Sequence, residues 1–402
     1  MKEITFIHAA DLHLDSPFKG LRKLPEALFQ HIKDSTFESL QILIDEAITR
    51  EVDFVLFSGD LYDGENRNLR TQVKFRKEME RLKQHGIQVY IIHGNHDHLG
   101  GKWISIEQPD NVHIFSGQSE VKAFKKDDCV TYIYGYSYPT QHVNQSIVDK
   151  YVKREGADYH IGMLHGSAEG QSEHSRYAPF TVDELMKKSF DYWALGHIHK
   201  RQELASSPPI IYPGNIQGRH KKEYGVKGCY YVKLQGKHAQ LEFVPTATIV
   251  WNSIEVLLEE NDTFDQLLMR CRMLLEQIRQ DSYCTLVEMK LSNYTDFMMH
   301  DQFQHDLLEI LQEEEEYKQN FVYPYSISLA ETVINDSSHP ILELVKTSEW
   351  TEQDVFEAIQ PLFKHSLGRK YITELSSEEK KQLIKKAQQM LSILLANGGN
   401  ER

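Results

Sequence analysis

Residues 4–16 read ITFIHAADLHLDS, in which a short apolar run leads directly into a cluster of polar side chains. The run from Ile4 to His8 has the length and composition of a buried strand. Asp11 and His13 follow it, separated by a single residue. Side chains just past the carboxyl ends of strands converge on one edge of a layered α/β sheet, where ligands bind. This stretch therefore predicts a strand that leads into a functional site.

Four more polar clusters occur before residue 200, and each follows a strand-like run. Their sequences are Gly59-Asp60-Leu61-Tyr62-Asp63, Gly94-Asn95-His96-Asp97, His165-Gly166 and Gly196-His197-Ile198-His199. The apolar runs before them are 54–57, 89–92, 160–164 and 192–195, and segments 25–50 and 69–85 have the periodicity of amphipathic helices. This alternation of strands and helices predicts an α/β layered fold.

Each cluster taken alone is an ordinary feature of protein loops. Gly-Asp-x-x-Asp is a common turn in which aspartate bonds to its own backbone, and a lone histidine is more often a buried structural residue than a ligand. Five clusters at the ends of strand-like runs in one chain are difficult to obtain by chance. The set as a whole therefore favours one shared site.

The side chains in these clusters are those of a binuclear metal site. Carboxylate, imidazole and amide oxygen together suit Mn²⁺, Fe²⁺ or Zn²⁺, and the clusters contain no thiol. An aspartate that follows a strand can bridge two ions, and water held between such ions is acidic enough to attack phosphorus near neutral pH. The predicted ligands are Asp11, His13, Asp60, Asn95, His165, His197 and His199.

Composition and charge are compatible with a nucleic-acid enzyme, although the net charge is −14. Residues 1–250 have 31 Lys and Arg against 32 Asp and Glu, whereas residues 251–402 have 14 against 27, so the acidic excess lies in the second part. Two divalent ions would make the first part locally positive. The sequence shows no secretory signal and no apolar run of membrane-spanning length, and its four cysteines form no CxxC pair, so we expect a reduced, cytoplasmic protein without a membrane anchor.

The series D-x-H, GDxxD, GNHD, H and GHxH resembles the signature of the calcineurin-like metallophosphoesterases. Within that family the chain is most similar to the SbcD-type DNA repair exonucleases, and to their YhaO-like subgroup in Gram-positive bacteria. The stretches HAADLHLDSPF at 8–18 and YPGNIQGRH at 212–220 favour that branch. The resemblance covers about residues 4–245 and is weak beyond residue 250.

The resemblance implies a role for each predicted ligand. The first metal would be bound by Asp11, His13 and His199, the second by Asn95, His165 and His197, and Asp60 would bridge both. Mn²⁺ is the expected ion, with Fe²⁺, Zn²⁺ and Mg²⁺ as alternatives.

The resemblance also implies catalytic roles for residues that are not ligands. His96 would contact the scissile phosphate, and Asp97 would orient His96. Some relatives have a second phosphate-facing histidine at the position of Asp63, where this chain has an aspartate. It therefore remains open at this stage whether a second side chain assists the reaction.

Basic residues that follow two of the clusters are candidates for contacts with the DNA backbone. Arg67 and Arg70 come after the second cluster, and Arg219, Lys221 and Lys222 come after the fifth. They could hold phosphates without reading bases. An ordinary solvated helix face and an ordinary basic loop would have the same sequences.

We expect three domains. Residues 1–250 would form the metallophosphoesterase domain, with two β-sheets flanked by helices. Residues 251–335 would form a small α+β domain that caps the nuclease and binds DNA. Residues 336–402 would form a helical tail that could dock an SbcC-like coiled-coil ATPase. A homodimer is expected as well.

The predicted function is that of an Mn²⁺-dependent DNA exonuclease in DNA repair, which could also cut as an endonuclease. Two alternatives remain at this stage. The same site would serve a phosphodiesterase for a small nucleotide or cyclic diester, and the chain could be a non-catalytic scaffold that binds DNA or an ATPase. An intact set of seven ligands argues against the scaffold.

Overall fold

The computed structural model describes most of the chain. The described residues are 2–18, 24–64, 68–102, 104, 106–169, 177–259, 262–292, 301–330, 350–364 and seven positions between 377 and 387. Among the sequence predictions, the DNA contact at Arg67 and most of the helical tail at 336–402 lie outside these residues.

The first sheet has six strands in the order β12-β11-β1-β2-β3-β4. Strands β1, β2, β3 and β4 are parallel neighbours, and β11 pairs antiparallel with both β1 and β12. The bounds are β1 Glu3–Ala9, β2 Phe54–Ser58, β3 Gln88–Ile92, β4 Val112–Ile114, β11 Gly228–Gln235 and β12 His238–Pro245.

The second sheet also has six strands, in the order β5-β6-β7-β8-β10-β9. Strands β6, β7, β8 and β10 are parallel neighbours, and β5 and β9 are antiparallel edge strands. The bounds are β5 Glu120–Lys126, β6 Cys129–Gly135, β7 Tyr159–His165, β8 Tyr192–Gly196, β9 Gln202–Ser206 and β10 Pro209–Tyr212.

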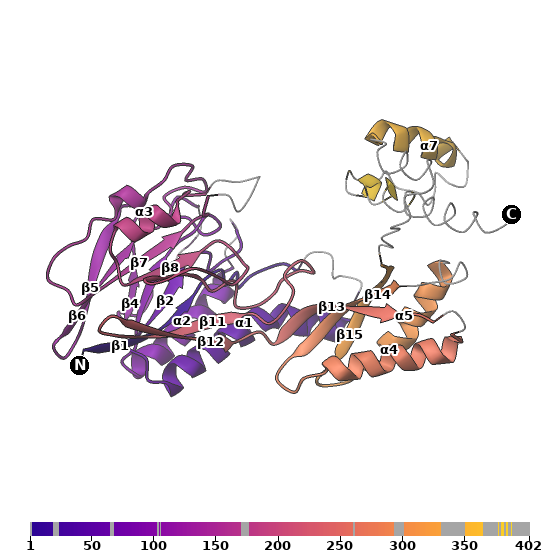
Figure 1. Ribbon diagram of the computed structural model, residues 1–402, viewed down its shortest axis with the longest axis horizontal. Coiled ribbons are helices and arrows are strands. Elements are labelled where there is room, and N and C mark those ends of the chain that lie inside the picture. Colours follow the sequence, from indigo (N-terminus) through magenta and orange to yellow (C-terminus); the bar gives the residue numbers. More distant parts are fainter. Residues whose placement is uncertain are drawn as a thin grey trace. The chain divides into compact units, whose positions relative to one another are not determined.

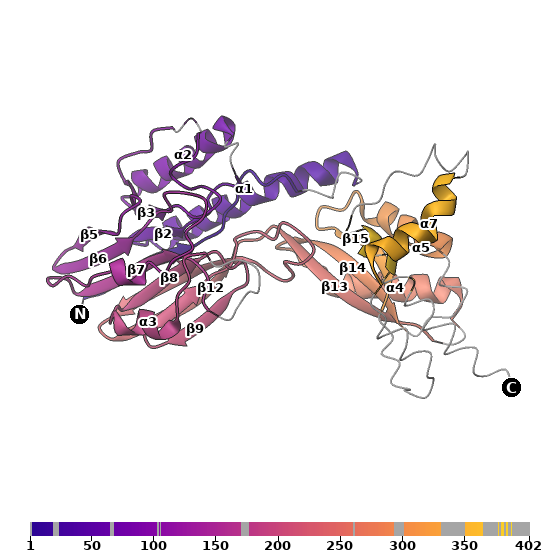
Figure 2. The same cartoon turned by 90° about the horizontal axis from the view of Figure 1, so that it is seen from above.

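The two sheets pack face to face between helices, as Figures 1 and 2 show. Phe6 and Phe54 of the first sheet share a buried cluster with Ile161 and Tyr192 of the second. Helices α1 (Glu26–Thr49) and α2 (Leu69–Gln84) cover the outer face of the first sheet, and α3 (Val182–Lys187) lies on the side of the second. This arrangement confirms the predicted layered α/β fold with two sheets flanked by helices.

A third sheet of three strands, in the order β13-β14-β15, follows the two large ones. Its strands are β13 Ile249–Leu257, β14 Cys284–Ser292 and β15 Val322–Leu329, and they alternate with α4 (Phe264–Ile278) and α5 (Asp301–Glu315). Trp251 and Leu286 of this sheet lie in one buried cluster with Leu28 and Ile32 of α1. Shared burial of apolar side chains therefore ties the start of the α+β segment to the phosphoesterase body.

The described residues form two compact units. The first contains the three sheets and helices α1 to α5, as far as residue 328. The second contains short pieces near 257–259 and 291–292 together with the described residues after 328, among them α7 (Glu352–Lys364). The side chain of Asp354 caps the start of α7 by accepting from the backbone N–H of Thr351 at 2.7 Å.

Among the helices that the structure describes, none combines the length and the apolar composition that a membrane crossing requires.

Candidate metal centre

The five polar clusters lie at the carboxyl ends of strands from both large sheets. The first three follow β1, β2 and β3 of the first sheet, and the last two begin at the ends of β7 and β8 of the second. Within each sheet these strands run parallel, so their loops emerge at the same edge. The structure brings all seven predicted ligands together at this edge, as the following distances show.

Four of the seven ligands have a left-handed backbone, which side chains other than glycine seldom adopt. Their φ angles are 53° at Asp11, 43° at His13, 52° at Asp60 and 100° at His197. Hydrogen bonds between the loops hold this conformation: Asp11 N donates to the carbonyl of Gly59 at 3.0 Å, and His13 N to that of Asp60 at 3.0 Å. Backbone strain concentrated on buried polar residues is typical of functional sites.

The first group of ligand atoms consists of Asp11, His13 and His199, whose donor atoms lie within 4.8 Å of one another. Nε2 of His13 is 3.2 Å from Nε2 of His199. Nδ1 of His199 donates to Oε1 of Glu223 at 2.6 Å, and Nδ1 of His13 lies 3.2 Å from Oδ1 of Asp63. Since a carboxylate faces each Nδ1, the two Nε2 atoms turn lone pairs toward each other, and a cation between them would satisfy both.

The second group consists of Asp60, His165 and His197, with Asn95 beside them. Nδ1 of His165 donates to the carbonyl of Ser58 at 2.9 Å, so the lone pair of a neutral ring lies on Nε2. That atom faces Oδ1 of Asn95 at 3.1 Å and Oδ2 of Asp60 at 3.3 Å, which are both acceptors. Oδ1 of Asn95 also lies 3.2 Å from Nδ1 of His197. These acceptor atoms face one another with no donor from the described residues between them, which is the arrangement expected around a bound cation.

Asp60 lies between the two groups. Its Oδ2 is 3.3 Å from His165 in one group and 3.9 Å from His13 in the other. Both oxygens are buried, and Oδ1 accepts from the backbone N–H of His96 at 2.9 Å. The carboxylate of Asp60 therefore lies where a ligand that bridges two ions would lie.

The pKa shifts show how strongly this site requires positive charge. Burial alone would lower the pKa of His165, but the carboxylates of Asp60 and Asp11 raise it to about 9. Burial and the neighbouring His165 lower the pKa of His197 to about 3. Without metal, a proton on His165 supplies part of the positive charge that two ions would supply, and His197 is kept neutral, as a metal ligand must be.

His96 lies beside the ligands without joining either group. Its side chain is 40% exposed, its ring centroid is 5.0 Å from that of His13, and its Nδ1 lies 3.5 Å from Oδ1 of Asp63. An imidazole that is half exposed at the edge of a buried metal site is accessible to a substrate phosphate. The role that the resemblance implies for His96, contact with the scissile phosphate, stays a prediction.

Asp97 holds the loops of the second and third clusters together. Its carboxylate accepts from the backbone N–H groups of Leu61 at 2.9 Å and Gly94 at 2.7 Å, and it lies 3.0 Å from Nδ1 of His93. The carboxylate that the structure places beside the His96 ring is that of Asp63. The family resemblance had implied that Asp97 orients His96.

The predicted DNA contacts are dispersed. Arg70 is exposed at the start of α2, and Lys221 and Lys222 are exposed on the loop after β10. Arg219 differs from them, because its side chain is 12% exposed and its Nη1 lies 3.1 Å from Oδ1 of Asp63. Arg219 thus belongs to the metal centre rather than to the open surface.

Glu223 is a residue of the site that sequence reasoning missed. It is buried, and one of its oxygens accepts from His199. The other accepts from Nδ2 of Asn215 at 2.9 Å and from the backbone N–H of Arg219 at 2.6 Å. An acid in the middle of a basic loop was the available signal, since Arg219, Lys221 and Lys222 precede it closely in the sequence.

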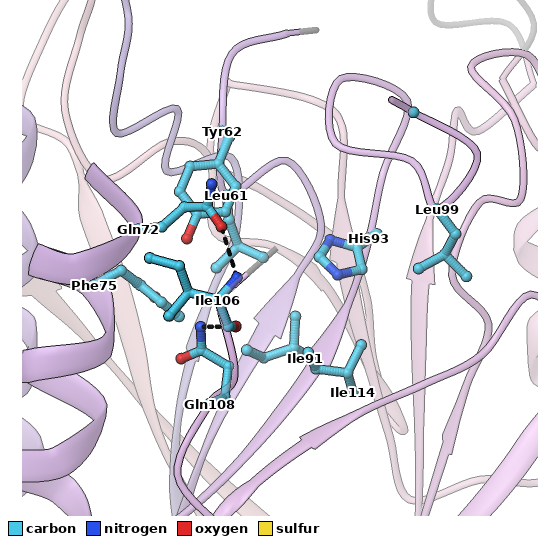
Figure 3. Close-up of a pocket in the computed structure, with 11 residues that line it drawn as sticks. Leu61, Tyr62, Gln72, Phe75, Ile91, His93, Leu99, Ile106, Gln108 and Ile114 are labelled. Carbon is cyan, nitrogen blue, oxygen red and sulfur yellow. Dashed lines mark hydrogen bonds between the residues drawn. The ribbon is translucent and has the colours of Figure 1, made fainter. Parts of the chain in front are cut away.

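A cavity of about 300 Å³ lies beside the second and third clusters, between α2, β3 and β4 (Figure 3). Leu61 and Tyr62 line it on one side and His93 on another, and the side chain of Gln72 binds the backbone of Ile106 within it. None of the seven ligands lines this cavity, so it is separate from the metal centre.

Comparison with known proteins agrees with this geometry. The sequence profile of the calcineurin-like phosphoesterases matches residues 4–201, a range that includes all seven ligands and His96. The chain is 39% identical to the uncharacterized metallophosphoesterase YhaO of Bacillus subtilis (strain 168), over 97% of this chain and 98% of that protein.

More distant similarity connects the chain to proteins named DNA double-strand break repair protein Mre11. Identity is 27% with that of Methanocaldococcus jannaschii, over 65% of this chain and 71% of the relative. It is 29% with that of Saccharolobus solfataricus, over 57% and 60%. The chain therefore belongs to the calcineurin-like phosphoesterase family, whose members use a pair of divalent ions, and it is a metal-dependent phosphodiesterase with candidate ligands for such ions.

Proposed function

We propose that the chain is an Mn²⁺-dependent DNA exonuclease that hydrolyses phosphodiester bonds and can also cut as an endonuclease. The observation that carries this proposal is the convergence of seven ligand side chains, five buried and two partly buried, in two groups around Asp60, with the half-exposed His96 at their edge. Two divalent ions in such a site supply Lewis acidity toward a phosphoryl oxygen and lower the pKa of bound water.

The ligands divide between the two ions as their geometry suggests. Asp11, His13 and His199 would hold one ion, Asn95, His165 and His197 the other, and Asp60 both. Oxygen and imidazole donors without a thiol favour Mn²⁺. Ser58 and Glu223 would fix the two histidines that they contact, so that Nε2 of each ring faces an ion.

His96 would act on the substrate. Its imidazole would contact the scissile phosphate and donate a proton to the leaving oxygen. The carboxylate of Asp63, 3.5 Å from Nδ1, would keep that nitrogen protonated and direct Nε2 outward.

DNA is the substrate that the relatives and the charge distribution favour. The Mre11 proteins to which the chain is similar are named for the repair of DNA double-strand breaks. The exposed Lys221 and Lys222 lie on the loop that Glu223 connects to His199, so they are candidates for contacts with the DNA backbone near the metal centre, as is Arg70.

The remaining assignments extend this proposal to the rest of the chain. Residues 251–335 would cap the nuclease and guide DNA, and residues 336–402 would dock an SbcC-like coiled-coil ATPase in a homodimeric, cytoplasmic assembly. These assignments are supported by the resemblance of the chain to the SbcD-type exonucleases.

Metal-free protein, assayed with Mn²⁺, Mg²⁺ or Zn²⁺ added back, tests the proposal. We expect Mn²⁺ to restore degradation of linear duplex DNA from its ends, and Asp60→Asn to remain inactive with every ion. Closed circular DNA separates endonuclease from exonuclease activity. Hydrolysis of bis-para-nitrophenyl phosphate or cyclic dinucleotides without hydrolysis of DNA would identify a small-diester enzyme instead. If no substrate is hydrolysed with any ion, the remaining hypothesis is a non-catalytic scaffold that binds DNA or an ATPase.

A further inference from the structure

One oxygen of Asp63 joins a metal ligand, the phosphate-facing histidine and an arginine. Oδ1 lies 3.2 Å from Nδ1 of His13, 3.5 Å from Nδ1 of His96 and 3.1 Å from Nη1 of Arg219. The backbone of Asp63 is fixed in turn, because its N–H donates to Oδ1 of Asp15 at 2.7 Å. Arg219 and His96 therefore converge on a single point at the edge of the metal centre.

The guanidinium of Arg219 has hydrogen-bond donors that the described part of the protein does not use. The side chain is only 12% exposed, and Nε is buried without an acceptor among the described residues. Asp63 is the partner that the structure gives this guanidinium, whose planar fork has five donors. Leaving such donors unpaired in a buried position is unfavourable unless a ligand supplies the acceptors.

The backbone of Arg219 is held as firmly as its side chain. Its N–H donates to Oε2 of Glu223 at 2.6 Å, and Oε1 of the same carboxylate accepts from His199 at 2.6 Å. Arg219 is thus fixed to one metal ligand through Glu223 and faces another, His13, across Asp63. Lys221 and Lys222, two and three residues further on, are exposed.

We propose that Arg219 contacts the scissile phosphate itself and stabilises the charge that develops on it during hydrolysis, with Asp63 as its positioning residue. This inference rests on phosphodiester hydrolysis at the metal centre. Arg219 would donate two hydrogen bonds to the non-bridging oxygens, a geometry that guanidinium suits better than ammonium. The proton for the leaving group would come from His96, as proposed above. Arg219 and His96 would together contact the phosphate, so that Arg219 would take the place of the second phosphate-facing histidine that some relatives have at position 63.

Two different roles for this cluster fit the structure less well. His13, Asp63 and His96 could together hold a third ion, but Nη1 of Arg219 already lies against the oxygen that such an ion would need. Arg219 could instead be a general contact for distant DNA phosphates. A residue in that role belongs on an open surface, whereas this side chain is largely buried beside the ligands.

The test compares Arg219→Gln with Lys237→Gln on bis-para-nitrophenyl phosphate and on linear duplex DNA, both with Mn²⁺. Lys237 is an exposed residue in the turn between β11 and β12, at the edge of the first sheet opposite to Asp11, so its replacement removes one charge far from the site. We expect Arg219→Gln to lower kcat about 10²-fold on both substrates, at low and high salt alike, because removal of one donor to a developing oxyanion has that effect. Lys237→Gln should behave as the wild type.

Two further measurements distinguish contact with the phosphate from a structural role. The manganese content of Arg219→Gln should equal that of the wild type. Guanidinium ion added to Arg219→Ala should restore part of kcat, and Arg219→Lys should fall between the wild type and Arg219→Gln.

Three results would overturn the inference: an unchanged kcat on the small diester, a loss restricted to DNA at high salt, or loss of manganese from Arg219→Gln. A wild type that hydrolyses neither substrate would instead count against the proposed function, so the two failures are distinguishable.

Discussion

Oδ2 of Asp60 lies 3.3 Å from Nε2 of His165, although the two side chains belong to loops of different sheets. Asp60 follows β2 in the first sheet, and His165 ends β7 in the second. The backbone of β2 also orients His165, because the carbonyl of Ser58 accepts from its Nδ1. The metal centre is thus assembled by the packing of one sheet on the other, and any change that separates the two loops should remove metal.

Gly94→Ala should weaken metal binding although it replaces no ligand. A Cβ at this position would lie 2.3 Å from Oδ1 of Asp60 and 2.6 Å from Nε2 of His165, so both ligands would have to move. We expect manganese content, measured by elemental analysis, to fall by at least one ion per chain. Gly117→Ala is the matched control, since its Cβ would meet Pro139 at 3.3 Å, away from the ligands. Full metal content in Gly94→Ala would contradict the convergence of Asp60 and His165.

His96→Ala should separate metal binding from catalysis. His96 belongs to neither ligand group around Asp60, so the variant should retain the manganese content of the wild type. Loss of a general acid typically lowers the rate about 10²- to 10⁴-fold, and we expect kcat to fall within this range. His305→Ala, at an exposed position of α5, controls for loss of a histidine as such. If His96→Ala still cleaves at the normal rate, its assigned role is wrong.

Glu223→Gln should weaken the affinity for metal. Its carboxylate accepts from Nδ1 of His199, and although burial opposes ionisation, His199 and Arg219 hold the pKa of Glu223 well below its usual range. Loss of a carboxylate that orients a ligand histidine typically lowers metal affinity about 10- to 100-fold. Titration with Mn²⁺, followed by electron paramagnetic resonance, measures this effect.

The matched control for Glu223→Gln is Glu242→Gln, which removes an equally charged partner of Arg50 at an exposed position of β12. The two variants should differ in metal affinity by at least the tenfold stated for Glu223. Equal affinities would show that Glu223 serves only the folding of its loop.

His8 should make the metal-free protein sensitive to acid. It is buried between the hydroxyl of Tyr192, 2.9 Å from Nδ1, and the carbonyl of Leu195, 3.1 Å from Nε2. Burial lowers its pKa from 6.5 to about 3. Between these pH values the unfolded chain binds a proton that the folded chain excludes, so the free energy of unfolding decreases as pH falls, by about 1.4 kcal/mol per pH unit for this group.

His8→Gln keeps a polar side chain and removes the titration. Urea unfolding of the metal-free variant and of the metal-free wild type should be compared between pH 6.5 and about pH 3. The free energy of unfolding of His8→Gln should decrease less steeply with falling pH than that of the wild type, with slopes that differ by up to about 1.4 kcal/mol per pH unit. His305→Gln should retain the wild-type slope, because His305 is exposed. An identical slope for His8→Gln would mean that His8 is protonated in the folded state.

Sequence reasoning located the strands that position the metal centre. The runs before the five clusters correspond to β1, β2, β3, β7 and β8, with ends within about a residue of the prediction, because continuous apolar runs that end in glycine or aspartate have a strong local signal. The edge hairpin β5–β6 and strands β9 and β10 were not predicted. Strand β5 is only partly buried and has three lysines among its seven residues, so its sequence resembles a solvated loop.

The sequence by itself determined which side chains could bind metal, since ligand chemistry depends on residue type and on placement after a strand, and both are local properties. Only the tertiary structure decided which partner each of these side chains has. Asp63 lies beside His96 and Arg219, Asp97 holds the loop backbone, and Glu223 supports His199 from a loop that follows another strand. These pairings depend on how closely the two sheets and their loops pack, to within about an ångström. The pattern of residues along the chain does not specify the distances between side chains of different loops.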